Sequence, residues 1–112
     1  EVEDNPKYFW AITIKSSSKH IGNIKIDPIN YDDLKGEYGI LIGDKNFWGM
    51  GFAEESSIAV LNFCFKTLKL KQIELGVMTE NSRAISLYKK IGFTIKKSNS
   101  KNHYRMIINQ IS

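Results

Sequence analysis

The fold is decided by residues 37–77, which read EYGILIGDKNFWGMGFAEESSIAVLNFCFKTLKLKQIELGV. The aromatic and β-branched side chains of Glu37–Ile42 predict a strand. Apolar residues then recur every three or four positions from Phe52, which predicts an amphipathic helix that ends near Leu70. Gln72–Val77 predicts the next strand. Because such helical crossovers are right-handed, the two strands are expected to be parallel if they share one sheet.

The flanking sequence extends this unit on both sides. Strands are predicted over Phe9–Ile14, Ile21–Ile26, Phe93–Ile95 and His103–Ile108, and a second helix is capped by Asn81 or Ser82 and ended by Gly92. Turn-forming residues predict a loop over residues 27–35. The order is therefore β-β-β-α-β-α-β-β, which indicates one α/β domain over residues 1–112 with a mixed, mainly antiparallel sheet.

Composition excludes several classes of protein. A chain of 112 residues that is 42% hydrophobic has enough apolar material for one core, so disorder and low complexity are excluded. A single cysteine and the lack of an apolar leader indicate a reducing, cytoplasmic location. The longest apolar stretch, Ile58–Phe65, is far short of the roughly 20 residues that a membrane helix needs.

Charge is distributed unevenly along the chain. Residues 1–64 carry a net charge of −4 and residues 65–112 a net charge of +8. A basic half attracts a nucleic acid or a polyphosphate cofactor, and it is equally typical of an ordinary solvated surface. Lysine outnumbers arginine fourteen to two, which disfavours specific nucleic-acid recognition, because that usually depends on arginine.

The segment Asn46–Ala53 lies between the third strand and the first helix. Gly49 and Gly51 allow its backbone to approach a ligand where the unpaired N–H groups of a helix start point outward, which is the arrangement of a pyrophosphate cradle. The alternative is a simple turn with packed aromatic neighbours. A Rossmann fingerprint is disfavoured because the third glycine is missing, and a Walker loop is excluded because no Gly-Lys-Ser/Thr occurs.

A second segment follows the fourth strand. Asn81 is followed seven residues later by Tyr88 and eleven residues later by the pair Gly92-Phe93, which begins with the glycine. Together with the segment from Asn46, which matches Q/R-x-x-G-x-G/A except at its first position, this resembles the GNAT superfamily of acetyl-CoA-dependent N-acetyltransferases. The chain looks most like the branch that acetylates protein N-termini, especially of ribosomal proteins, and its small-molecule relatives.

The resemblance implies a fold and a cofactor site. Acetyl-CoA would lie where the third and fourth strands separate, and its thioester carbonyl would meet a backbone N–H near Leu41 or Ile42. Asn81 would bond the pantetheine arm, although a helix N-cap is the simpler role for it. The pyrophosphate would be held by the backbone N–H groups of the cradle residues Trp48, Gly49, Met50, Gly51, Phe52 and Ala53.

The resemblance also implies direct attack of a primary amine on the thioester, either a protein N-terminus or a small-molecule amine. Tyr88 is the candidate acid for the departing thiolate, because a phenol is protonated at neutral pH, and simple packing is the alternative. Glu37 is the candidate base, with a solvated carboxylate as the alternative. Cys64 is expected in the core, and His20 and His103 lack partners at metal-ligand spacing, so no metal is expected.

Two other functions remain open, namely a catalytically silent acyl-CoA-binding or regulatory module and, less favoured, a basic nucleic-acid-binding domain. Family members place a strand and two helices ahead of the hairpin that begins here near Tyr8. We therefore expect that an upstream acceptor half is absent, trimmed or supplied by another chain. We also expect an exposed apolar sheet surface through which the chain associates, as a homo-oligomer or otherwise.

Overall fold

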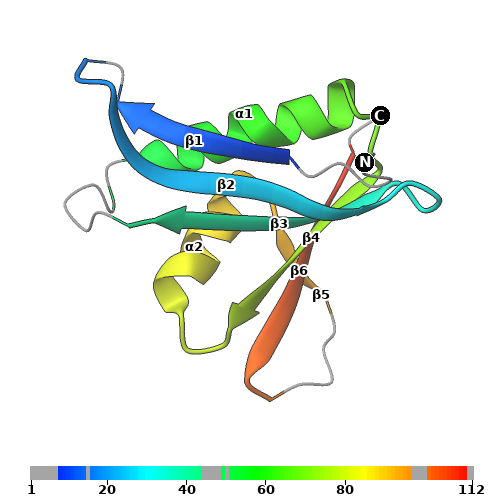
Figure 1. The fold of residues 1–112 in the computed structure, drawn as a ribbon. Coiled ribbons are helices and arrows are strands. Elements are labelled where there is room, and N and C mark those ends of the chain that lie inside the picture. Colours follow the sequence, from blue (N-terminus) through cyan, green and yellow to red (C-terminus); the bar gives the residue numbers. More distant parts are fainter. Residues whose placement is uncertain (1–7, 15, 44–48, 50, 97–100, 111–112) are drawn as a thin grey trace.

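The computed structural model describes residues 8–14, 16–43, 49, 51–96 and 101–110. Within these residues lie six strands and two helices in the predicted order (Figure 1). They are β1 (Tyr8–Ile14), β2 (Lys19–Asn30), β3 (Lys35–Ile42), α1 (Phe52–Lys66), β4 (Gln72–Met78), α2 (Ser82–Ile91), β5 (Thr94–Lys96) and β6 (His103–Asn109).

The described strands form one mixed sheet in the order β1-β2-β3-β4-β6-β5. β3 and β4 are parallel, with α1 as the crossover between them, and the other neighbouring pairs are antiparallel. The expected α/β class and mainly antiparallel sheet are confirmed. α1 ends at Lys66, earlier than expected, because Lys69 has a left-handed φ of 60° and the chain turns there to bury Leu70 in the core.

The loop predicted over residues 27–35 is largely wrong. β2 continues to Asn30 and pairs again with β3 through Ile29 and Gly36, after a shift in register between Ile26 and Ile29. Pro28 has no N–H to donate, so the ladder is interrupted there, but Ile29 is buried and returns the strand to the core. The turn itself is confined to residues 31–34. There Oδ1 of Asn30 accepts hydrogen bonds from the backbone N–H groups of Asp32 and Asp33.

The parallel pair is short. β3 and β4 pair only through Lys35–Glu37 and Gln72–Glu74, and beyond that point the two strands diverge (Figure 1). The divergence leaves a wedge between the second half of β3 and the second half of β4. The resemblance implies that acetyl-CoA would lie where these two strands separate.

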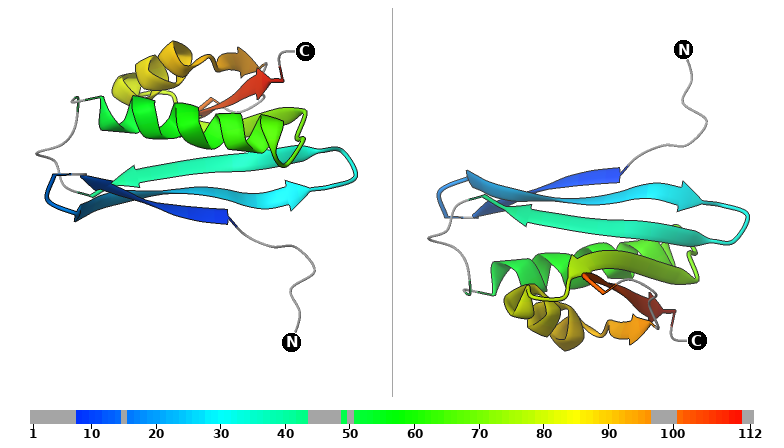
Figure 2. Two further views of the ribbon diagram at one scale, coloured as in Figure 1. Left: turned by 90° about the horizontal axis from the view of Figure 1, so that it is seen from above. Right: turned by 90° about the horizontal axis from the view of Figure 1, so that it is seen from below.

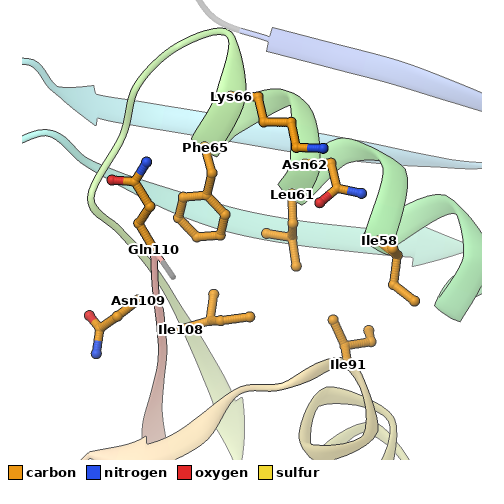
Figure 3. Close-up of a pocket in the computed structure, with 9 residues that line it drawn as sticks. All are labelled: Ile58, Leu61, Asn62, Phe65, Lys66, Ile91, Ile108, Asn109 and Gln110. Carbon is orange, nitrogen blue, oxygen red and sulfur yellow. The ribbon is translucent and has the colours of Figure 1, made fainter. Parts of the chain in front are cut away.

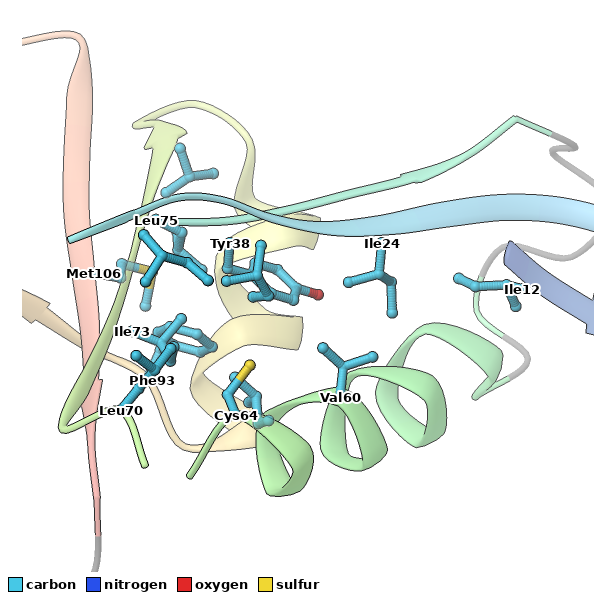
Figure 4. Packing of buried hydrophobic residues seen from close by; sticks show 14 of the residues in the cluster. Ile12, Ile24, Tyr38, Val60, Cys64, Leu70, Ile73, Leu75, Phe93 and Met106 are labelled. Atoms are coloured by element: carbon cyan, nitrogen blue, oxygen red, sulfur yellow. The ribbon is translucent and has the colours of Figure 1, made fainter. Parts of the chain in front are cut away.

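Both helices lie on the same side of β1–β3 (Figure 2). Their apolar faces and the inward residues of the sheet form one core, in which Phe93, Ile24 and Leu75 are almost fully buried (Figure 4). Each such side chain contributes about 1.5–3 kcal/mol of transfer free energy on burial. The core therefore fixes α1 and α2 against the sheet and so fixes the geometry of the wedge.

Candidate functional site

Two glycines bend the segment that leads into α1. Gly49 and Gly51 have φ values of 76° and 85°, a region that side-chain-bearing residues rarely adopt. Gly51 is the N-cap of α1, and among the described residues no side chain forms a capping hydrogen bond there. The first N–H groups of a helix have no partner within the helix itself, so a helix start of this kind is suited to an anion. Trp48 and Met50 lie outside the described residues.

A pocket of about 490 Å³ opens between β3, the start of α1 and the exposed face of α2. It brings most of the predicted site residues together: Leu41, Ile42, Gly49, Gly51, Ala53, Asn81 and Tyr88. Phe52 and Glu37 are not among its lining residues. The two sequence segments that suggested a cofactor site, one before α1 and one in α2, therefore meet in one pocket.

Tyr88 is half-buried on the pocket side of α2. Its ring lies edge-on to Tyr38 at a centroid distance of 5.9 Å and packs on Phe93 at 6.1 Å. Burial raises the pKa of its phenol above the usual value of 10. The hydroxyl is therefore a neutral hydrogen-bond donor at physiological pH, the form that an acid requires.

Asn81 occupies the N-cap of α2, and its Oδ1 accepts a hydrogen bond of 3.2 Å from the N–H of Ala84. The N-cap role is confirmed, and the same residue lines the pocket. At the other end of α2, Gly92 has a φ of 126° and lies so close to β6 that a Cβ would be 3.0 Å from Ile108. The Gly-Phe pair thus ends the helix and directs Phe93 into the core.

Glu37 faces the side of the sheet opposite the helices, because it precedes the inward-facing Tyr38 on β3. Its carboxylate forms a bidentate ion pair with Arg105 of β6, at 2.7 and 3.0 Å. This hydrogen bonding raises the pKa of the Arg105 guanidinium. The structure therefore places the predicted base outside the pocket and in a paired state, and its catalytic role stays a prediction.

Cations at the pocket were missed by the sequence reasoning. The Arg83 guanidinium lies beside the cradle, 3.1 Å from the position of a Cβ on Gly49. Lys90 lines the pocket and forms an ion pair with Glu54 of α1 at 3.5 Å. Arg83, Leu87 and Lys90 are spaced to share one face of α2, and this spacing combined with the basic C-terminal half was the available signal.

A second pocket of about 340 Å³ lies between α1, the end of α2 and β6 (Figure 3). Its lining is mostly aliphatic and aromatic, with Lys66 as its one titratable residue. None of the predicted site residues that the structure describes lines it, and it shares no lining residue with the pocket that holds Tyr88.

Cys64 is fully buried in the core, as expected, and burial raises the pKa of its thiol to about 11. Among the described residues, no group of three His, Cys, Asp or Glu side chains is placed to hold a metal ion. No described helix has both the length and the apolar character needed to cross a membrane.

The wedge, the glycine cradle and the Asn81–Tyr88 helix can be compared with known proteins. Residues 1–94 match the family model described as an acetyltransferase (GNAT) domain. The chain belongs to the GNAT acetyltransferase family. The resemblance drawn from its motifs is thereby confirmed at the level of the family, and the GNAT fold is confirmed by the solved structures below.

Several GNAT relatives are similar over most of this chain. A Bacillus licheniformis protein, named as the uncharacterized N-acetyltransferase p20, is 31% identical over 75% of this chain and 47% of its own length. The spermidine N(1)-acetyltransferase of Escherichia coli K12 is 26% identical over 74% of this chain and 44% of that enzyme. A solved variant of the Vibrio cholerae spermidine N-acetyltransferase aligns with a TM-score of 0.84 at 27% identity, over 95% of this chain and 67% of the other.

These comparisons also set the scope of the family assignment. The chain spans about half or less of the length of the curated relatives it matches. The relatives described above are named for spermidine or for acetyl transfer in general, so the expected ribosomal-protein branch stays a prediction.

Proposed function

We propose that this chain is the acetyl-CoA-binding part of an N-acetyltransferase that transfers an acetyl group to a primary amine. The observation that carries the proposal is the meeting of the glycine cradle, Asn81 and Tyr88 in one pocket at the β3–β4 wedge. Family membership supports acyl transfer as the class of reaction.

The pocket residues fit a CoA ester. Backbone N–H groups at the left-handed Gly49 and Gly51 would hold an anionic pyrophosphate, and Arg83 would add a guanidinium beside them. Lys90 supplies a second cation at the rim. Asn81 lines the pocket and would bond the amide-bearing arm of the cofactor. When bound, acetyl-CoA supplies an activated thioester.

The β3 backbone provides a donor for the thioester carbonyl. The N–H of Gly43 donates to Ile21 of β2. Because successive N–H groups of a strand point to opposite edges, the N–H of Ile42 faces the wedge. As predicted from the sequence, we propose that a backbone N–H near Leu41 or Ile42 polarises the carbonyl.

Proton transfers accompany the reaction. The neutral amine nitrogen forms a bond to the acetyl carbon while the carbon–sulfur bond breaks, and Tyr88 gives its phenolic proton to the leaving thiolate. The proton that the nitrogen loses as the amide forms restores the phenol. A primary ammonium must lose a proton first, since its pKa is about 10.4 in the case of lysine. The sequence predicts Glu37 as the base, but its carboxylate is paired with Arg105 and would need to leave that residue or act through water to serve.

The acceptor class proposed is a small amine or a protein N-terminus, and the names of the relatives add spermidine to the compounds to be tested. Association of chains is proposed as well. Phe9, Leu41 and Met78 are 62%, 66% and 47% exposed on the sheet face that no described helix covers. A Vibrio cholerae structural neighbour is dodecameric.

The proposal is tested by incubating the full-length protein with acetyl-CoA and a panel of amines that includes spermidine, lysine derivatives and N-terminal peptides. Acetylated product by mass spectrometry, with saturable acetyl-CoA binding in calorimetry, is the expected result. Saturable binding without any product would support the silent CoA-binding module instead. No acetyl-CoA binding at all would overturn both, and salt-sensitive affinity for nucleic acid would then support the third function.

A further inference from the structure

The vertex of the wedge is held by one guanidinium. Glu37 and Glu74 form the last pair of the parallel β3–β4 ladder, so the two strands separate immediately beyond them. Arg105 binds both carboxylates, Glu37 through two hydrogen bonds of 2.7 and 3.0 Å and Glu74 through one of 3.3 Å. These contacts join three strands, β3, β4 and β6, at the point where backbone pairing between β3 and β4 ends.

Arg105 reaches β3 only by crossing β4. It pairs with Gly76 of β4, so its side chain must pass over the backbone of that strand to meet Glu37. Gly76 leaves the room for this path, because a Cβ at that position would be 3.2 Å from Nη1 of Arg105. The glycine and the arginine thus act as one structural unit.

The two carboxylates at the vertex explain why a guanidinium that can bind both of them is needed there. Two carboxylates placed opposite each other on neighbouring strands repel, so the ladder would be weakest at its last pair without a cation between them. Glu37, Glu74 and Arg105 are only partly exposed, and a bidentate arginine holds such a geometry better than a lysine does. Lys96 contacts Glu74 at 3.8 Å from the outer side, away from the wedge.

We propose that Arg105 is a positioning residue that fixes the separation of β3 and β4 at the vertex of the wedge. Glu37 is then its structural partner rather than the catalytic base. The inference rests on the proposed function, since the spacing of the two strands matters for the acyl-CoA arm that enters between them. It assigns a role to residues that lie outside the pocket and 68 positions apart in sequence.

The experiment compares four variants of the full-length protein: Arg105→Lys, Arg105→Gln, Glu37→Gln and, as the control, Lys96→Gln. Acetyl-CoA affinity is measured by calorimetry, and backbone amide exchange is measured in β3 and β4. We expect Arg105→Gln to weaken binding by about 5–10-fold and to speed exchange near the vertex, and Arg105→Lys to weaken it by about 3-fold. Lys96→Gln removes a charge from the same cluster and is expected to change neither quantity.

Kinetics separate positioning from catalysis. If Glu37 holds Arg105, Glu37→Gln raises KM for acetyl-CoA, keeps most of kcat and leaves the shape of the pH–rate profile unchanged. The Glu37→Gln/Arg105→Gln double variant is then no worse than Arg105→Gln alone, because both changes remove one interaction. The opposite result would make Glu37 the base. In that case Glu37→Gln would lose most of kcat and the acidic limb of the pH–rate profile, whereas Arg105→Gln would keep the kinetics of the wild type.

Unchanged affinity and unchanged exchange in Arg105→Gln would overturn the inference. Circular dichroism checks that each variant folds. If Arg105→Gln does not fold, Arg105→Lys, which keeps the positive charge, serves as the test variant in its place. If the wild-type protein binds no acetyl-CoA, the proposed function fails. The amide exchange of β3 and β4 still reports in that case whether Arg105 holds the strands.

Discussion

The hydroxyl groups of Tyr38 and Ser57 form a buried hydrogen bond of 2.5 Å that joins β3 to α1 beneath the site. Ser57 is fully buried, and Tyr38 is 4% exposed. Figure 4 shows Tyr38 among the core side chains. The Tyr38 ring in turn lies edge-on to Tyr88. Burial raises the pKa of Tyr38, so its hydroxyl stays neutral and hydrogen-bonded. The pair therefore fixes the surface against which the proposed acid packs.

Tyr38→Phe is expected to destabilise the protein by about 1–3 kcal/mol, because the Ser57 hydroxyl is left buried without this partner. Tyr38→Phe/Ser57→Ala is expected to lose less than the sum of the two single variants, since both partners of one bond are then removed. Urea unfolding of the three variants measures the coupling. Strictly additive losses would mean that the two hydroxyls do not depend on each other.

Tyr88→Phe is expected to lower kcat by about 100-fold while acetyl-CoA affinity stays close to that of the wild type, because the phenol acts on the leaving group and not in binding. Burial raises the pKa of Tyr88 above 10, so the acid form persists and kcat is expected to show no loss from its ionisation below that pH. Tyr104→Phe is the control, since this half-buried tyrosine of β6 does not line the pocket. Normal turnover by Tyr88→Phe would remove the acid assignment.

The order of the elements could be predicted because each strand and helix carries its own periodicity and its own stop signal, such as Gly92 after α2. The end of β2 could not, because the turn-forming residues around Pro28 favour a loop, whereas the burial of Ile29 keeps the strand in the sheet. The pocket residues on the two motifs were found from local spacing. The contacts of Arg105 with Glu37 and of Tyr38 with Ser57 were not, because they depend on strand register and helix packing between distant segments.

Gly49→Ala and Gly51→Ala are each expected to weaken acetyl-CoA binding and to destabilise the protein by about 1–2 kcal/mol, because both residues have left-handed φ values. Among the described residues, no atom lies within 4 Å of a Cβ on Gly51, so the loss of stability there is expected from backbone strain. Gly49→Ala also presses on Arg83. Gly43→Ala is the control, since a Cβ there has room and its φ is not left-handed. Calorimetry measures the affinity for acetyl-CoA, and thermal unfolding measures the stability. If all three variants had the same affinity and the same stability, the proposed role of Gly49 and Gly51 in a cofactor cradle would be wrong.

Asn81 is predicted to serve both α2 and the cofactor, and two substitutions separate these roles. Asn81→Ala is expected to lose about 1 kcal/mol of stability with the cap and also to weaken acetyl-CoA binding. Asn81→Ser keeps a capping oxygen, so we expect stability close to the wild type and affinity still reduced several-fold. If Asn81→Ser matches the wild type in calorimetry as well, Asn81 is a helix cap and nothing more.

The buried thiol of Cys64 predicts a loss of stability at alkaline pH. In the unfolded chain the thiol ionises near its ordinary pKa of 9.0, whereas in the folded protein its pKa is about 11. The unfolded state therefore binds fewer protons between these values, and the stability present below pH 9 declines as the pH rises toward 11, by at most about 1.4 kcal/mol per pH unit. Cys64→Ala lowers stability at every pH, because it leaves a small cavity. Between pH 8 and 10, however, the stability of this variant is expected to fall less steeply with pH than that of the wild type. At higher pH the ionisation of the buried tyrosines Tyr38 and Tyr88 also lowers stability in both proteins. Urea unfolding across this range measures the two slopes, and parallel curves for the two proteins would show that Cys64 is not the group responsible.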